Sequence, residues 1–248
     1  MVREFLFEEN YLSYLSNEDI INGILTPKNG IFMEKVISSG ELYAIIPYFE
    51  KLRDIDPPKN KIFMSLDDGK IKEFEIVLNK HLNRIPREIE NLTALRRLNI
   101  YIDVSYTGNI FEEIFNIPSV IYLTIICDSN VIIPDSFHYF PNLRYLRVRG
   151  SEPFNKPTIS FENSFKKLTN LEELYLYFVK LKNIPNSIIN LKKLNHLSLS
   201  KTTLKTLPVS LMCSLRSLKI FELKFNFNLE IQKAEIEELE KKLILSIY

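Results

Sequence analysis

The feature that most constrains this chain is a pattern of leucines that repeats between positions 168 and 211. Leucines recur there in an LxxLxL spacing, and Leu176 and Leu199 hold the same place in frames 23 residues apart. Each frame closes on an aliphatic residue and a proline, as at Ile184-Pro185 and Leu207-Pro208. A fixed period of about 20–29 residues with this spacing indicates a solenoid, in which each unit adds one strand and one return segment. Because a single unit cannot bury its apolar face, stacked units share a continuous core.

The position of Leu176 can be followed along most of the chain. Its equivalents lie 23 to 28 residues apart and are Ile76, Ile100, Ile125, Val148, Leu176, Leu199 and Leu223. Extra residues before Leu176 fall within 151–161, where we expect a loop at one rim of the solenoid. Such insertions often make specific contacts, with a neutral change of length as the alternative. Before the first unit, two β-prone runs flank Asp68-Gly69, which predicts a hairpin over residues 62–76.

The repeat resembles the leucine-rich repeat family, in the form whose units read LPxxIxxLxxL. The resemblance rests on the apolar spacing, the aliphatic-proline pair and the period, which recur together. It implies an α/β fold, a curved right-handed horseshoe with a parallel sheet of seven or eight strands on its concave face.

The family also places an asparagine three residues after the second strand leucine, where the side-chain amide bonds the backbone of a tight bend. Asn79 and Asn226 match this position, whereas Val179 cannot supply an amide. The other units carry polar residues that could replace the amide in part: Asp103, Asp128, Ser151 and Thr202. We therefore expect an irregular bend near Val179.

Both ends of a solenoid need a cover over their apolar core. Residues 1–60 do not fit the repeat, and apolar residues from Phe5 to Leu15 fall at helical spacing. We expect a helical capping region over 1–60, followed by a repeat domain over 61–248. A separate functional domain in 1–60, including an enzyme, is the alternative. Residues from about 230 to 248 resemble the family's helix-and-strand ending, with Leu239 and Leu243 on one helix face.

Function is predicted from the residues that alternate with the inward leucines. Because side chains in a strand alternate between two faces, these residues point to the concave side. Tyr and Arg gather there, and these residue types most often dominate interface energies. We predict that a protein or peptide is bound by Arg97, Asn99, Tyr101, Tyr122, Tyr145, Arg147, Arg149, Glu173, Tyr175, Tyr177 and His196. The alternative is a self-satisfied surface, since strands favour Tyr and pair opposite charges.

Other chemistry finds little support in the sequence. The three histidines are isolated, and the six glycines form no phosphate-binding loop. We therefore expect no catalytic residue, no metal, no cofactor and no enzyme. Lys plus Arg total 32 against 31 Asp plus Glu, a balance that favours neither nucleic acid nor an anionic membrane. Of the two cysteines, we expect Cys127 to be partly exposed and Cys213 to fill apolar space.

The expected location is the cytoplasm, and the expected state is a monomer. The first residues include acidic side chains where a signal peptide needs an unbroken apolar run. No stretch reaches the length of a membrane span, and the two cysteines form no disulfide framework. The alternative is a bacterial effector or adhesin that reaches a foreign partner by a signal-independent route.

Overall fold

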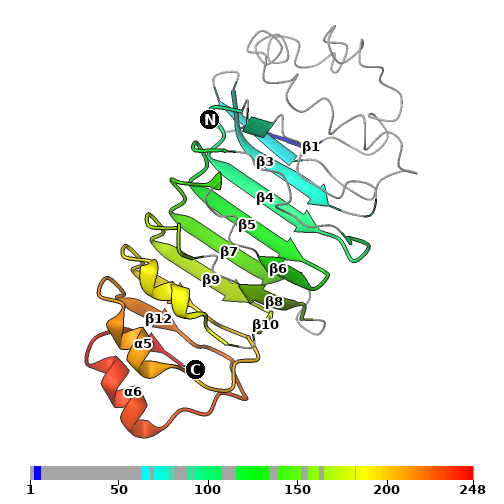
Figure 1. The fold of residues 1–248 in the computed structure, drawn as a ribbon. Coiled ribbons are helices and arrows are strands. Elements are labelled where there is room, and N and C mark those ends of the chain that lie inside the picture. The colour runs from blue at the N-terminus through cyan, green and yellow to red at the C-terminus, as the bar shows by residue number, and fades with distance from the viewer. Residues whose placement is uncertain are drawn as a thin grey trace, which may run out of the picture.

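The sheet of this protein is the scaffold on which every predicted contact residue lies (Figure 1). The computed structural model describes residues 3–6, 63–67, 70–78, 80, 89–90, 92–107, 116–133, 139–151, 156–161, 165–181 and 183–247. Ten strands form one sheet in the order β1-β2-β3-β4-β5-β7-β9-β11-β12-β13. Its eight parallel strands are β3 (Lys70–Leu78), β4 (Arg97–Ile102), β5 (Tyr122–Cys127), β7 (Tyr145–Gly150), β9 (Glu173–Tyr177), β11 (His196–Ser198), β12 (Ile220–Glu222) and β13 (Ile244–Ser246).

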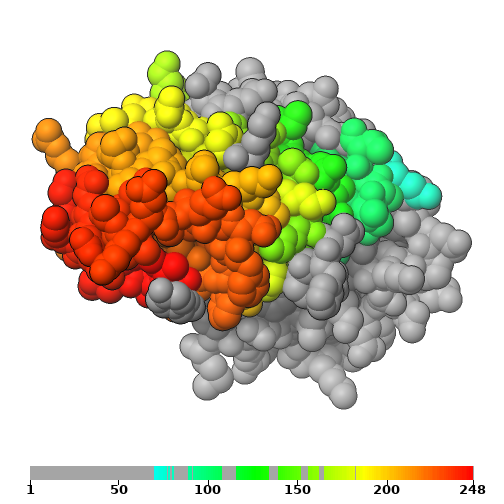
Figure 2. Space-filling view, turned by 90° about the horizontal axis from the view of Figure 1, so that it is seen from below, coloured from blue at the N-terminus to red at the C-terminus, as the bar shows by residue number. Residues whose placement is uncertain are grey.

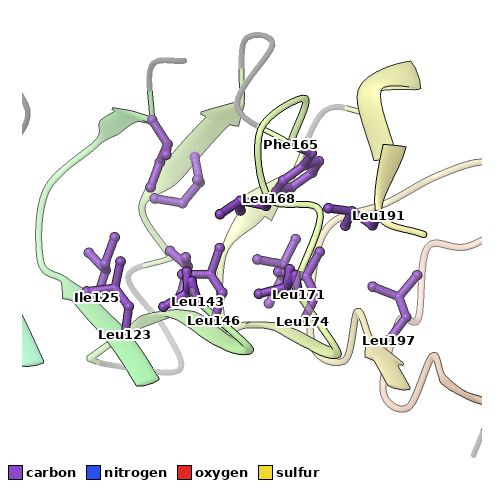
Figure 3. Close-up of a cluster of buried hydrophobic side chains, with 14 of the residues drawn as sticks. Leu123, Ile125, Leu143, Leu146, Phe165, Leu168, Leu171, Leu174, Leu191 and Leu197 are labelled. Atoms are coloured by element: carbon purple, nitrogen blue, oxygen red, sulfur yellow. The ribbon is translucent and has the colours of Figure 1, made fainter. Parts of the chain in front are cut away.

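The strand register confirms the alignment of the repeats. In β3, β4, β5, β7 and β9 the residues that lie side by side are Ile76, Ile100, Ile125, Val148 and Leu176. Further along, Leu174 lies beside Leu197, which lies beside Phe221. These inward residues are at most 2% exposed, and the leucines of neighbouring units meet inside the stack (Figure 3). The predicted parallel sheet of seven or eight strands is therefore confirmed, with eight.

The N-terminal edge of the sheet is antiparallel. Strand β2 (Phe63–Asp67) pairs with β3, and Asp67 lies opposite Lys70, which confirms the hairpin predicted around Asp68-Gly69. Strand β1 (Arg3–Leu6) pairs with β2, so the helical prediction is wrong for these residues. An extended segment here covers a strand edge that would otherwise leave backbone groups unpaired. The rest of 1–60 lies outside the described residues, and the helical cap predicted there stays a prediction.

The described residues also form a second, three-stranded parallel sheet, whose strands come after β5, β7 and β9 in the chain. It consists of β6 (Val131–Ile133), β8 (Thr158–Phe161) and β10 (Lys180–Leu181) in the order β10-β8-β6. The prediction of a rim loop over 151–161 is thus wrong for 158–161. Ile159 in β8 is 1% exposed, because it joins the core, and the Thr158 N–H donates to Asn130 Oδ1 at 2.7 Å.

The return segments after β9 and β11 carry short helical turns. The 3-10 turn η3 (Asn186–Asn190) buries Ile188, and α5 (Val209–Ser214) buries Val209 and Met212. No helix among the described ranges is long and apolar enough to cross a bilayer.

The described chain ends in a helix and a strand. Helix α6 (Lys233–Glu240) begins with a capping box between Gln232 and Glu235, and it buries Leu239 against the last units. Strand β13 then pairs with β12. Seen from below, these C-terminal segments, in orange and red, cover that end of the stack (Figure 2).

The units differ in how the chain leaves the main sheet. Two residues after the repeating aliphatic position, Leu78, Ile102 and Cys127 continue their strands and are fully buried. The burial of Cys127 contradicts the expectation of partial exposure, and it raises the pKa of the thiol. In later units the equivalent residues take left-handed φ angles and are Phe178 (51°), Lys201 (57°) and Phe225 (60°).

Gly150 marks the boundary between these two kinds of unit. A Cβ placed on Gly150 would lie 2.4 Å from the backbone oxygen of Phe178, so only glycine allows the two segments to approach this closely. Val179 is fully buried and fills the core. The bend at Phe178 has the same left-handed conformation as two later bends, so the prediction of an irregular bend near Val179 is wrong. The change between the two kinds of unit comes at Gly150.

The asparagine position is used as predicted in the last unit. Asn226 Nδ2 donates to the carbonyl oxygens of Leu199 at 2.6 Å and Leu223 at 2.8 Å. Its Oδ1 accepts from the backbone N–H and the hydroxyl of Thr202, both at 2.8 Å. Asp103 plays a smaller part, since its Oδ1 accepts the Ser105 N–H at 2.8 Å. Asn79 lies outside the described residues.

Candidate interaction surface

The predicted contact residues share one face of the main sheet, which we call the outer sheet face. Along β4, β5, β7 and β9 burial alternates with period two: the inward side chains are buried and the alternating ones are exposed or half-buried. All the residues of the predicted patch lie at these outward positions or at the start of β11. They are Arg97, Asn99, Tyr101, Tyr122, Tyr145, Arg147, Arg149, Glu173, Tyr175, Tyr177 and His196.

Tyrosines on this face pack against one another. Ring centroids are 5.6 Å apart for Tyr122 and Tyr145, 5.0 Å for Tyr145 and Tyr175, and 5.7 Å for Tyr175 and Tyr177. We call these four residues the tyrosine ladder. The His196 ring meets Tyr175 edge-on at 4.9 Å. Each such aromatic pair adds about 0.5–1.5 kcal/mol beyond burial alone, so the ladder holds its rings in place.

Polar contacts fix the C-terminal part of the ladder. The Tyr175 hydroxyl donates to Glu173 Oε2 at 2.6 Å and lies 3.0 Å from His196 Nδ1. Burial, and then the hydrogen bond and charge of Glu173, raise the pKa of Tyr175 above its ordinary value. His196 Nε2 lies 3.6 Å from Glu222 Oε2, a contact that links β11 to β12. The sequence did not single out Glu222, because its position in the frame carries acidic, basic, polar and aromatic residues in different units.

Tyr101 stands apart from the ladder. Its hydroxyl donates to Asp128, which also accepts from the Ser151 hydroxyl. Burial, and then this carboxylate, raise the pKa of Tyr101. Tyr101 therefore lies in the predicted patch, but its hydroxyl is already engaged within the chain. Asp128 was expected to bond the backbone of the bend, and it accepts side-chain hydroxyls instead.

We expect the tyrosines to ionise in two phases. The pKa values of Tyr101, Tyr175 and Tyr177 are raised, chiefly by burial, so these groups should lose their protons above pH 10, the ordinary value. The folded protein then binds protons that the unfolded chain releases, so stability should be unaffected below about pH 10 and fall as pH rises beyond it. Tyrosinate absorbance, recorded while circular dichroism shows a folded chain, measures the phases. Tyr175→Phe should remove one late-titrating group, and a single phase near pH 10 would contradict this assignment.

The arginines of the face differ in their partners. Arg97 Nε lies 3.5 Å from Glu73 Oε1, and the Arg97 guanidinium lies 4.9 Å from the Tyr122 ring centroid. Arg147 lies over the rings of Tyr145 at 5.5 Å and Tyr175 at 5.7 Å, and it donates one hydrogen bond to the Tyr145 hydroxyl.

Strand β7 thus carries the uncompensated positive charge of this face. Arg147 Nε is shielded from solvent and has no hydrogen-bond partner. Arg149 makes one long contact, from Nη1 to the Gly150 carbonyl oxygen at 3.5 Å. Within the described part of the chain, neither arginine lies within ion-pairing distance of a carboxylate, whereas Arg97 does.

The face closes toward the C-terminus. Ser198 and Ser200 occupy outward positions of the repeat but are buried, and their hydroxyls lie 3.1 Å apart. Ser198 is small and lies in register between Tyr175 and Glu222, whose larger side chains cover it. The open part of the outer sheet face therefore ends near His196.

The sequence reasoning missed a second aromatic group at the rim of the sheet. Lys201 Nζ lies 4.6 Å from the Phe178 ring centroid and 5.0 Å from that of Phe225. Phe225 also lies beside Phe227, which is 90% exposed. The available signal was the shared position of Phe178, Lys201 and Phe225, each two residues after the repeating leucine.

Metal chemistry gains no support from the described ranges, which contain no group of three or more His, Cys, Asp or Glu side chains able to hold an ion. The two cysteines are free, and Cys213 is half-buried on α5 with its thiol pKa raised chiefly by burial. What the outer sheet face offers is ring surface, hydroxyls and, among the described residues, two arginines without a carboxylate partner.

No family model and no curated protein matches this sequence. Among solved structures, the chain is similar to an internalin (inlF) from Listeria monocytogenes, with 19% sequence identity and a TM-score of 0.42. The similarity covers 71% of this chain and 46% of the internalin, so this chain spans less than half of that protein.

Proposed function

We propose that the outer sheet face binds a protein or peptide partner without covalent chemistry. The observation that carries this proposal is the tyrosine ladder, in which the rings of Tyr145 and Tyr175 flank Arg147 on a face of exposed and half-buried side chains. In the leucine-rich repeat fold that the sequence resembles, this face would be the concave side of a right-handed horseshoe. The proposal involves no catalytic residue and no cofactor.

The ladder is suited to binding because its rings are already ordered. A tyrosine offers a large ring and a hydroxyl with few rotamers to immobilise. Tyr145 contacts two other rings, and Tyr175 contacts three rings and a carboxylate. Since side-chain ordering opposes association, a partner that meets rings already held in place loses less free energy on binding. Tyr122 is 36% exposed and supplies the most accessible ring surface.

The alternative raised by the sequence was that the polar side chains of this face pair only with one another. It accounts for only part of the face. Arg97, Asn99 and Glu73 do satisfy one another, with an Asn99 Nδ2 to Glu73 Oε1 distance of 3.3 Å. The same does not hold for Arg147 and Arg149, which lack a carboxylate partner among the described residues. We therefore place the centre of the proposed contact on β7 and β9.

The experiment is affinity capture from an extract of the source organism, with mass spectrometric identification of the retained proteins. Tyr145→Ala combined with Tyr175→Ala should reduce capture by tenfold or more, because a single interface hot spot contributes about 2 kcal/mol. Ile189→Ala is the control, since Ile189 is an exposed apolar residue of the return segment η3, away from the ladder. Unchanged capture by the double variant, with a preserved thermal transition, would refute the proposal.

The cytoplasmic location and monomeric state also stay proposals. Finding the protein in culture supernatant of intact cells would favour the alternative of a secreted effector or adhesin. The capture experiment would then be repeated with extract from a host, using the same variants.

A further inference from the structure

The distribution of charge on the outer sheet face points to one chemical feature of the partner. Arg147 and Arg149 alternate along β7, so both project from the same face about 7 Å apart. Their neighbours in register on β9 are Tyr175 and Tyr177, and those of Arg149 on β5 include Ile126. Two arginine side chains therefore leave the same face of β7, with tyrosines on β9 and with Thr124 and Ile126 on β5 as their neighbours.

The positive charge of Arg147 is compensated only in part by its surroundings. Arg147 is half-buried, its Nε is shielded from water without a hydrogen-bond partner, and two rings cover its guanidinium. The nearest carboxylate in register, Glu173, already accepts the Tyr175 hydroxyl at 2.6 Å. Removing a guanidinium from water is unfavourable unless it is paired, and its planar donors match a carboxylate in two parallel hydrogen bonds.

Resting on the proposed function, we propose that the bound segment is an acidic peptide whose Asp or Glu side chain pairs with Arg147 and Arg149 between the tyrosines. The ring stack holds the Arg147 guanidinium in place before binding, so little side-chain freedom is lost when the carboxylate arrives. The flanking rings of Tyr145, Tyr175 and Tyr177 then contact the peptide residues on either side of the acid.

A nucleic acid strand fits the same face less well. A polyanion carries a phosphate at every nucleotide and needs a continuous basic stripe. Here Glu75 lies toward one end of the face and Glu173 and Glu222 toward the other. Burial, and then the charge of Glu73, raise the pKa of Glu75. Among the described residues of this face, the arginines without a carboxylate partner lie only on β7, which suits one or two carboxylates in an otherwise uncharged segment.

The test is selection from a displayed random-peptide library on the immobilised full-length chain. The wild-type protein should enrich peptides with Asp or Glu at one shared position. Arg149→Glu should enrich Lys or Arg at that position instead, because the local charge is reversed. Arg216→Glu is the control, since Arg216 is exposed on the return segment after α5 and should leave the selected sequences unchanged. Replacing the selected acid by its amide in a synthetic peptide should weaken binding about tenfold or more.

The outcomes separate this inference from the proposed function. The selected peptides could share no acidic residue and still fail to bind Tyr145→Ala/Tyr175→Ala. That result would support the proposed function and refute the acidic partner. Acid enrichment that persists in Arg147→Gln/Arg149→Gln would also overturn it, because the acid would then bind elsewhere. Absence of any peptide that binds the face would count against both. If no peptide binds but a single-stranded oligonucleotide binds the wild type and not Arg149→Glu, the partner is a nucleic acid and the acidic-peptide proposal is refuted.

Discussion

Replacing Phe221 with Ala is expected to lower the free energy of unfolding by about 3–5 kcal/mol. Phe221 lies in β12, is fully buried, and is one of the largest enclosed side chains of the core. Its neighbours in register are Leu197 and Leu245, so its ring joins the last two units to the closing strand. Truncation removes the buried apolar surface of the ring and leaves a cavity. The hydrogen-bonded strands around Phe221 are held in place by their neighbours, so they cannot move in to fill it.

Urea denaturation followed by circular dichroism measures this effect. Phe227→Ala is the matched control, because Phe227 is the same residue type and 90% exposed, and it should change stability by less than about 0.5 kcal/mol. In a solenoid each unit contacts mainly its neighbours, so Phe221→Ala should destabilise the C-terminal units first. Equal effects of the two substitutions would show that Phe221 does not lie in the core.

Asn226→Ala is expected to destabilise the protein by about 2–3 kcal/mol. The Asn226 amide donates to the carbonyl oxygens of Leu199 and Leu223 and accepts from the N–H and hydroxyl of Thr202. Thr202 is 4% exposed, so water cannot readily replace the lost bonds. Unsatisfied buried polar groups are more unfavourable than the net contribution of the hydrogen bonds themselves, which sets the expected size of the effect.

The control is Asn228→Ala, which changes an exposed asparagine of the same segment and should leave stability within about 0.5 kcal/mol. Asn226→Asp separates the two roles of the amide. It keeps the acceptor that faces Thr202 but places a second oxygen against the carbonyls of Leu199 and Leu223, so it should also be destabilising. Both variants unfolding at the wild-type urea concentration would contradict the role assigned to Asn226.

The sequence predicted the inward positions of the sheet and their register. Leu174, Leu197 and Phe221 lie side by side, as the period requires, because each unit must present its apolar residues at the same height to share a core. The same alternation placed Tyr145 and Arg147 on the outer face. The hairpin around Asp68-Gly69 was predictable because its turn residues are local and specific.

Other features depended on neighbours that the repeat pattern does not describe. Residues 158–161 form β8 because strands from adjacent units meet there, and the prolines before them suggested a loop. Cys127 is buried because β5 runs one inward position further than the repeat predicts. Ser198 lies at an outward position yet is buried, because larger side chains on both sides cover it.

The sequence by itself determined which residues face the core and which face outward, because a strand alternates its side chains and the repeat sets the height of each strand. Only the tertiary structure decided how the outward residues pair. Arg97 pairs with Glu73, Tyr101 donates to Asp128, and Arg147 lies over the Tyr175 ring. These contacts join residues 24 to 28 positions apart in neighbouring units. Such contacts depend on side-chain direction and neighbouring volume, which periodicity does not specify.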